Sequence, residues 1–340
     1  ISKENNLLKE ILRLEKKVVS GPEWLYQNIL SNKKVIAVSG THGKTTVTSM
    51  IAHALINNNF DPNYLIAGIP KKLEKSWNIS NDEVFVIEAD EYDTCYFDKR
   101  PKFFHYRPNI LLINNIEFDH ADIYENIEMI EKNFFELIKT MPSKSKVLIN
   151  EKKVSKSFRN KLKKEKLKTT LQFLSLNTSN IHEENKLLAA HAIEDLISKE
   201  KVLNGLKDYI GVKRRFETIF NNKNFKLIDD FAHHPTAIEE TIKMIREQTD
   251  NLTLIVELGS NSMKRGVHDK RLVDIFKNQE TYTINASAEQ EKIFSVHAKE
   301  LTNDDIVKIC SKDEKKKTIL MCGNRNFHGF QKLILNQLIK

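Results

Sequence analysis

A glycine-containing segment, Gly40-Thr-His-Gly-Lys-Thr-Thr46, carries residue types that bind phosphate. It follows the apolar run 34–38 and precedes the helical pattern of residues 47–57. Glycines let backbone N–H groups approach a phosphate, and the N-terminus of a helix adds a favourable dipole. Lys44 would then neutralise the β- and γ-phosphates of a nucleotide, and the Thr45 hydroxyl would coordinate Mg²⁺. Because Val38 stands where the full phosphate-loop pattern has a further glycine, we expect a shortened loop.

Acidic residues and a histidine follow the next two apolar runs. The carboxylates that crowd the turn after residues 84–87 are Glu88, Asp90, Glu91 and Asp93. His120 comes directly after Asp119, beyond the run 110–113. Taken singly, these residues also fit a solvated acidic loop and a surface histidine. Because Mg²⁺ needs only one or two carboxylates beside a phosphate loop, their convergence on one sheet edge predicts an ATP–metal site.

Apolar runs that end in polar turns alternate with helical patterns along the whole chain. The runs are 34–38, 84–87, 110–113 and 147–149, and, after a break near residues 205–215, 225–228, 252–256, 281–284 and 318–322. This alternation is typical of a parallel sheet covered on both faces, in which ligands bind at the carboxyl ends of strands. We therefore predict an α/β fold: a central P-loop ATPase domain with a mostly parallel sheet, followed by a smaller Rossmann-like α/β domain. A length of 340 residues also favours two domains.

The composition is that of an ordinary globular protein, with 40% apolar and 29% charged residues. Much of the net charge of +8 comes from the Lys-rich stretch 152–168, in which Phe158 is the one aromatic residue. We expect it to be a solvated surface and expect no nucleic-acid partner. No apolar run reaches the roughly 18 residues of a membrane span, and no signal peptide is recognisable, so we expect no membrane partner. Three cysteines without metal-site spacing (Cys95, Cys310 and Cys322) favour a reducing cytoplasm.

Five motifs occur in an ordered series: GTHGKTT (40–46), EADEYD (88–93), NNIEFDH (114–120), GVKRRFE (211–217) and DDFAHHPTAI (229–238). In order and spacing they resemble the central and C-terminal domains of the Mur ligases, over nearly all of residues 18–335. The first and last motifs point to the branch of that family that acts on UDP-N-acetylmuramate. Residues 88–108 and 260–268 resemble the members that recycle peptidoglycan.

The resemblance implies an ATP-dependent carboxylate–amine ligase that forms ADP, with ATP and Mg²⁺ as cofactors. Its substrates would be UDP-N-acetylmuramate and the murein tripeptide L-Ala-γ-D-Glu-meso-diaminopimelate, joined through an acyl phosphate. The implied domains are a central ATP-binding domain over residues 31–210 and a C-terminal domain over residues 211–340. We expect a monomer.

The resemblance also assigns roles to single residues. Lys44, Glu88 and His120 would be catalytic, and Thr45, Glu88 and His120 would bind the metals. The residues that would contact the nucleotide are Gly40, Thr41, His42, Gly43, Lys44, Thr45, Thr46, Asn115, Asn185, Arg215, Asp230 and His234. Arg215 and Asp230 would hold a phosphate and the ribose. Their ordinary alternatives are a surface ion pair for Arg215 and a helix N-cap before Pro235 for Asp230.

Three departures from the family pattern bear on these expectations. The family has an N-terminal UDP-binding domain, and residues 1–30 resemble only the tail of one. An Asn-x-x-Asn pair is replaced by His182-Glu-Glu-Asn185, so only Asn185 matches. Glu257-Leu-Gly259 stands where members often carry Glu-Pro-Arg, and Gly323-Asn-Arg-Asn-Phe-His-Gly329 replaces a glycine-rich loop. Two other functions therefore remain open: a ligase that adds L-alanine alone, and a truncated or degenerate nucleotide-binding protein without activity.

Overall fold

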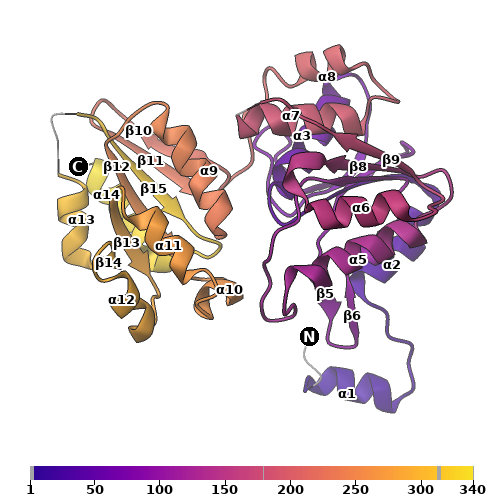
Figure 1. The fold of residues 1–340 in the computed structure, drawn as a ribbon, viewed down its shortest axis with the longest axis horizontal. Helices are drawn as coiled ribbons and strands as arrows, with labels where there is room; N and C mark the ends of the chain where they lie inside the picture. The colour runs from indigo at the N-terminus through magenta and orange to yellow at the C-terminus, as the bar shows by residue number, and fades with distance from the viewer. Residues whose placement is uncertain (1–3, 179, 312–314, 340) are drawn as a thin grey trace. The chain divides into compact units, whose positions relative to one another are not determined.

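The computed structural model describes residues 4–178, 180–311 and 315–339 (Figure 1). The chain divides into two compact units, Ile1–Ile210 and Gly211–Lys340. Each unit is built around its own sheet.

The first unit contains a seven-stranded sheet in the order β3-β2-β4-β1-β7-β8-β9. Its strands are β1 (Lys34–Ser39), β2 (Asn63–Leu65), β3 (Trp77–Asn78), β4 (Val84–Glu88), β7 (Ile110–Ile113), β8 (Lys146–Asn150) and β9 (Thr170–Leu174). All neighbouring pairs are parallel except β2 with β3. A separate hairpin consists of β5 (Asp93–Cys95) and β6 (Asp98–Pro101). The predicted, mostly parallel sheet is confirmed.

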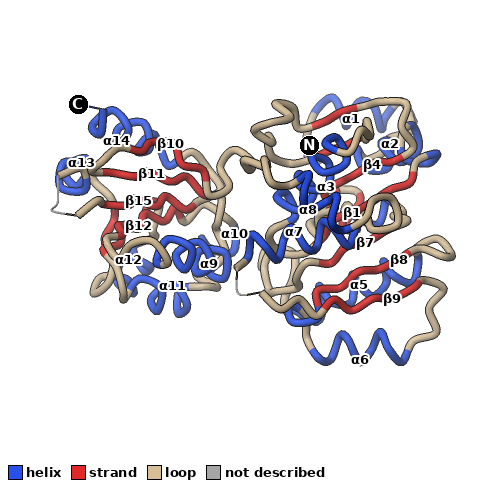
Figure 2. Tube along the Cα trace, turned by 90° about the horizontal axis from the view of Figure 1, so that it is seen from above, coloured by secondary structure: helices blue, strands red, loops and turns tan. Residues whose placement is uncertain are grey.

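Helices cover both faces of this sheet (Figure 2). The helical segments are α1 (Asn6–Arg13), α2 (Gly21–Asn28), η1 (Leu30–Asn32), α3 (Lys44–Asn57), α4 (Phe103–Tyr106), α5 (Ile127–Thr140), η2 (Glu151–Lys153), α6 (Lys156–Lys164), α7 (Ile181–Ala192) and α8 (Lys199–Gly205). Helices α3, α7 and α8 pack on one face, and α4, α5 and α6 pack on the other. Alternate residues of the central strands enter the two cores, which explains why the strands read as continuous apolar runs.

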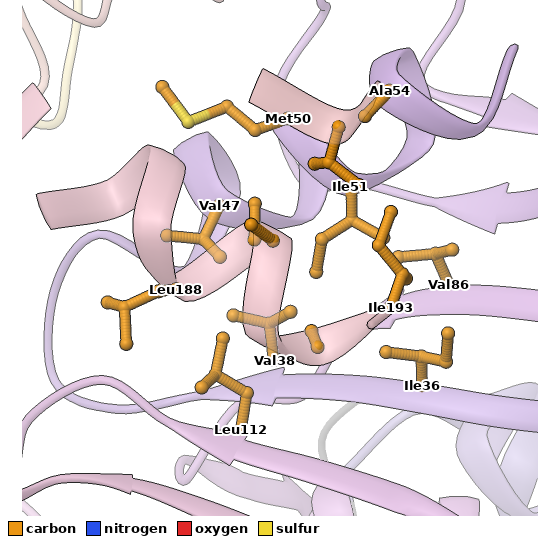
Figure 3. Packing of buried hydrophobic residues seen from close by; sticks show 14 of the residues in the cluster. Ile36, Val38, Val47, Met50, Ile51, Ala54, Val86, Leu112, Leu188 and Ile193 are labelled. Atoms are coloured by element: carbon orange, nitrogen blue, oxygen red, sulfur yellow. The ribbon is translucent and has the colours of Figure 1, made fainter. Parts of the chain in front are cut away.

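The core under α3 fixes the helix that follows the phosphate loop. Val47, Met50 and Ile51 of α3 are fully buried against Val38 of β1 and Leu188 of α7 (Figure 3). At roughly 25 cal/mol per Å² of apolar surface, each such side chain contributes about 1.5–3 kcal/mol. The start of α3, and the loop before it, is therefore held by packing on both sides.

The second unit is a smaller sheet of the same kind, in the order β10-β11-β15-β12-β13-β14. Its strands are β10 (Glu217–Asn221), β11 (Phe225–Asp230), β12 (Leu252–Glu257), β13 (Glu280–Ile284), β14 (Lys299–Glu300) and β15 (Lys317–Cys322). Its helical segments are α9 (Pro235–Arg246), α10 (Asn261–Lys264), α11 (Asp269–Phe276), α12 (Ala288–Phe294), α13 (Asn303–Ile309), η3 (Phe327–Gly329) and α14 (Phe330–Ile339). Among the described strands of this unit, only β10 is antiparallel to its neighbour. Two apolar clusters line its faces, as expected for a second α/β domain.

The surface features agree with the composition. The Lys-rich stretch 152–168 forms η2, α6 and the turn after them, and most of its lysines are exposed. Among the described helices, none is both long enough and apolar enough to cross a bilayer.

Candidate functional site

Strand order brings three distant segments of the first unit to one edge. Strand β1 lies between β4 and β7, and all three run parallel. Val38 pairs with Glu88 on one side, and Ser39 pairs with Ile113 on the other. The residues that follow Ser39, Glu88 and Ile113 therefore emerge side by side, as the sequence predicted.

The loop after β1 has a backbone that only glycine fits at two positions. Gly40 and Gly43 have φ angles of 129° and 80°. A Cβ on Gly40 would lie 2.8 Å from the carbonyl oxygen of Asn115, and one on Gly43 would lie 2.5 Å from Nδ2 of Asn114. Helix α3 begins directly afterwards, at Lys44. The result is a tight strand–loop–helix turn, and the first N–H groups of α3 lie directly after it, where the N-terminus of a helix favours an anion.

Residues 114–117, which follow β7, hold the loop from the side. Asn115 accepts a hydrogen bond from the His42 N–H through Oδ1 (2.9 Å) and donates one to the His42 carbonyl through Nδ2 (2.9 Å). The Thr41 hydroxyl accepts a hydrogen bond from the Glu117 N–H (2.8 Å) and donates to the Glu117 carbonyl (3.2 Å). Asn115 was expected to contact the nucleotide; the structure adds a loop-holding role that the sequence did not suggest.

Lys44 lies at the centre of the site, with little of its side chain exposed. Its Nζ is 2.7 Å from the Gly40 carbonyl oxygen, 2.9 Å from Oε2 of Glu91 and 3.5 Å from Oδ1 of Asp90. Burial alone would lower the pKa of Lys44, but the charges of Glu91, Asp90 and Glu88 outweigh it and raise the pKa. The ammonium group is therefore charged at every physiological pH and is available to neutralise phosphate.

Carboxylates and an imidazole surround Lys44. The Thr45 hydroxyl donates to Oε1 of Glu88 (2.9 Å), and the Ala67 N–H donates to Oε2 of the same residue (2.9 Å). Nε2 of His120 lies 3.3 Å from Oε1 of Glu91. One ligand atom from each of Asp90, Glu91 and His120 falls within 4.8 Å of the others. This donor set, mainly carboxylate oxygens with one imidazole, fits a divalent cation such as Mg²⁺.

The pKa values of Asp90 and His120, two members of this cluster, are also shifted from their ordinary values. Burial would raise the pKa of Asp90, but Lys44 and Lys102 hold it well below its usual range. Burial would lower the pKa of His120, but its contact with Glu91 outweighs burial and raises the pKa. Strong, opposed shifts in one small region are typical of functional sites.

Glu91 is the site residue that sequence reasoning did not single out. Its side chain is only 1% exposed, and it contacts both Lys44 and His120. In the sequence it is one of four acidic residues in a single turn, and nothing local distinguishes a buried carboxylate from a solvated one. Only the packing of the turn against the phosphate loop reveals its position.

A second group of potential metal ligands, Glu23, Asp98 and His105, lies elsewhere in the first unit. Here Asp98 already accepts two hydrogen bonds from the guanidinium of Arg100, at 2.9 and 2.8 Å. Carboxylates in both groups are already paired with a cation, but only the group around Lys44 adjoins the phosphate loop, so it fits a nucleotide-bound metal better.

Asn185 of α7 also lies at the phosphate loop. Its Oδ1 is 3.8 Å from the position that a Cβ on Gly43 would take. This oxygen is buried and has no hydrogen-bond partner within the described residues. Because a buried acceptor without a donor is costly, the atom is suited to receive a hydrogen bond from a bound ligand.

The three residues predicted in the second unit lie together near the end of β11. The buried Asp230 carboxylate accepts hydrogen bonds from the Ala232 N–H (2.9 Å) and the Thr241 hydroxyl (3.0 Å). Burial raises the pKa of Asp230, although the Arg215 charge opposes this. The Arg215 guanidinium is half-buried over the ring of Phe231, 4.6 Å from its centroid.

The structure also bears on the ordinary alternatives for these residues. His234, not Asp230, is the N-cap residue of α9, so the N-cap interpretation of Asp230 is wrong. The ring of His234 contacts that of His268, with centroids 4.8 Å apart. Arg215, packed on Phe231 and facing Asp230, is more enclosed than a simple surface ion pair.

Comparison with known proteins identifies relatives across both units. The profile of the Mur ligase middle domain matches residues 38–202, and that of the Mur ligase glutamate ligase domain matches residues 214–325. The UDP-N-acetylmuramate–L-alanyl-γ-D-glutamyl-meso-2,6-diaminoheptandioate ligase of Haemophilus influenzae is 33% identical over 78% of this chain. The UDP-N-acetylmuramate–L-alanine ligase of Caldicellulosiruptor bescii is 29% identical over 75% of this chain and 62% of its own length.

A solved structure shares both the fold and part of the sequence. The murein peptide ligase of Psychrobacter arcticus superposes with a TM-score of 0.71 at 26% identity, covering 99% of this chain and 84% of that one. The chain spans 65% of the length of the Haemophilus influenzae relative.

Proposed function

Because the chain belongs to the Mur ligase family, we propose that it is the ATP-dependent part of a carboxylate–amine ligase that forms ADP. The observation that carries this proposal is the cluster around Lys44. A phosphate loop, a buried cation and a set of metal-binding side chains meet at the carboxyl edge of one parallel sheet. Such an arrangement suits phosphoryl transfer, which depends on positioning and charge neutralisation.

The proposed reaction joins UDP-N-acetylmuramate to the tripeptide L-Ala-γ-D-Glu-meso-diaminopimelate in the cytoplasm. The sugar's lactoyl carboxylate would attack the γ-phosphorus of ATP and release ADP. The amine of L-Ala would then attack the resulting acyl phosphate, forming the amide, releasing phosphate and losing one proton. The loop N–H groups and Lys44 would hold the phosphates in line and neutralise their charge.

Mg²⁺, when bound, would supply further neutralisation of charge on the transferring phosphoryl group. We assign its protein ligands to Thr45, Glu88 and His120, with Glu91 and Asp90 adjacent. Lys44 would exchange its contact with Glu91 for the phosphates as nucleotide binds. For Arg215, Asp230 and His234, the proposal of nucleotide contacts rests on the family resemblance.

The choice of tripeptide rests on the relatives. A curated relative named for the tripeptide reaction is 33% identical, whereas one named for L-alanine addition is 29% identical. L-alanine ligation is therefore the second candidate. The altered loops of the second unit do not distinguish either ligase from a third candidate, a protein that binds nucleotide without turnover.

ADP release measured with ATP and Mg²⁺ separates these functions. We expect release to require both UDP-N-acetylmuramate and the tripeptide, with the amide product detected by mass. Release with L-alanine in place of the tripeptide would identify the second candidate. ATP binding without ADP release under any of these conditions would contradict ligase activity of this chain.

A further inference from the structure

Two departures from the family pattern lie against each other in the second unit. Strands β12 and β15 are parallel neighbours, with Val256 paired to Cys322. Gly259, in place of the pattern's arginine, follows β12. Arg325 follows β15, in the segment 323–329 that replaces the glycine-rich loop of the family pattern. Because adjacent parallel strands end at one sheet edge, residues remote in sequence meet there.

The side chain of Arg325 occupies the space that a side chain at position 259 would need. A Cβ on Gly259 would lie 2.8 Å from Oδ1 of Asn324 and 3.1 Å from both Cγ and Cδ of Arg325. Arg325 Nε donates a hydrogen bond to the Gly259 carbonyl oxygen (2.9 Å). An arginine from the loop after β15 therefore lies at the position where the family pattern has an arginine in the loop after β12.

The buried Glu257 holds the backbone of the loop that carries Arg325. Its Oε2 accepts a hydrogen bond from the Arg325 N–H (3.0 Å), and its Oε1 accepts one from the Phe327 N–H (3.1 Å). Glu257 is fully buried, whereas Arg325 is exposed. The backbone and Nε of Arg325 are thus tied down while its outer end faces solvent.

The outer end of this guanidinium is open. Across residues 4–178, 180–311 and 315–339, no carboxylate forms an ion pair with Arg325. Its Nη1 and Nη2 therefore present a two-pronged donor, held in place in advance, of the kind that binds a carboxylate through two hydrogen bonds.

We propose that Arg325 binds a carboxylate of the incoming peptide, taking the place of the arginine that the family pattern has at position 259. This inference rests on the proposed function, because the tripeptide is the proposed substrate whose carboxylates the reaction leaves free. It makes Arg325 a specificity residue of this chain rather than a group that takes part in phosphoryl transfer.

Variants of Arg325 and Gly259 test whether Arg325 binds the tripeptide. Arg325→Ala should raise the KM for the tripeptide roughly tenfold to hundredfold, the range of one charge-assisted contact, with little change in kcat or in the KM for ATP. Arg271→Ala, at an exposed arginine paired with Glu239, is the matched control and should leave the tripeptide KM unchanged. Gly259→Arg alone should be destabilised by its clash with Arg325, whereas Gly259→Arg combined with Arg325→Gly should recover tripeptide use.

Calorimetric binding of the tripeptide, without ATP, separates this inference from the ligase proposal. We expect the wild-type chain to bind the free acid more tightly than a tripeptide whose carboxylates are amidated, and we expect Arg325→Ala to lose that preference. If the wild type binds both forms equally, or if Arg325→Ala keeps the preference, the inference is overturned whether or not the chain turns over ATP. A double variant that folds but does not regain tripeptide binding would overturn the proposed exchange of positions.

Discussion

Nζ of Lys44 lies 2.9 Å from Oε2 of Glu91, so the cation of the phosphate loop is paired with a buried carboxylate. Glu91 in turn faces His120, at 3.3 Å. The three side chains form one charged chain from the loop to the candidate metal ligands. A nucleotide and its metal would take over both ends of this chain, which couples their binding.

Replacing Lys44 tests the centre of the site. Lys44→Ala should reduce ADP release by about 10²–10³-fold or more, because a positioned charge next to the transferring phosphate is lost. Lys139→Ala removes an exposed lysine that lies 3.8 Å from Glu165, and should leave the rate unchanged. Substantial ADP formation by Lys44→Ala would contradict the assignment of the loop.

Gly43 should not tolerate a side chain. Gly43→Ala adds a Cβ 2.5 Å from Nδ2 of Asn114 at a φ of 80°, so we expect weaker nucleotide binding and a lower Tm. Gly21→Ala is the matched control, because a Cβ at Gly21 has no neighbour within 4 Å. Fluorescent-nucleotide titration and thermal unfolding of both variants test this, and equal behaviour of the two would argue against a strained phosphate loop.

Asn185 should show opposite effects on stability and binding. Asn185→Ala removes an acceptor that has no donor, so the Tm should hold or rise while nucleotide affinity falls roughly tenfold. Asn150→Ala is the contrasting variant, because Asn150 donates to Oε1 of the buried Glu184 (2.7 Å) and its loss should lower the Tm. A fall in Tm for Asn185→Ala without loss of affinity would show a purely structural role.

His120 should make metal use dependent on pH. Its pKa is raised, so the protonated form is favoured in the folded chain, and its contact with Glu91 stabilises the fold fully below about pH 6.5. That stabilisation is lost as pH rises through the raised pKa. A metal ligand must be unprotonated, so the Mg²⁺ concentration for half-maximal ADP release should fall over the same rise in pH.

His120→Gln provides the comparison for this prediction. The variant should show a weaker pH dependence of Mg²⁺ use. Its stability deficit, measured by urea unfolding against the wild type, should be largest at low pH and shrink as pH rises. A deficit that grows with pH would mean that the sign of the His120 interaction is wrong.

Packing beneath α3 should control the stability of the first unit. Ile51→Ala empties a fully buried position and should cost about 2–5 kcal/mol in the free energy of unfolding. Ile56→Ala, on the same helix but 36% exposed, should cost much less. Urea unfolding monitored for the first unit tests the difference, and similar losses for the two variants would contradict the core shown in Figure 3.

The sequence predicted those helices and strands that a short, continuous pattern of residues specifies. The strand–loop–helix around Gly40–Thr46 and the buried runs of both sheets follow from apolar continuity and glycine placement, and they are confirmed. The short strands β2 and β3 and the antiparallel β10 were not predicted, because their few residues carry no distinctive pattern. The loop-holding amide of Asn115 and the buried Glu91 depend on how distant segments pack, which no local pattern encodes.

The position of β1 between β4 and β7 has a consequence for the order in which the chain folds. The phosphate loop is held by residues 114–117, and its lysine by Glu91, so these contacts form only when both neighbouring strands have docked. Loop closure over such sequence separations is slow compared with formation of α3 alone. Recovery of nucleotide binding during refolding should therefore lag behind recovery of helical signal. Because nucleotide binds only after the sheet edge is complete, it should stabilise the native state of the first unit without speeding the earlier folding steps.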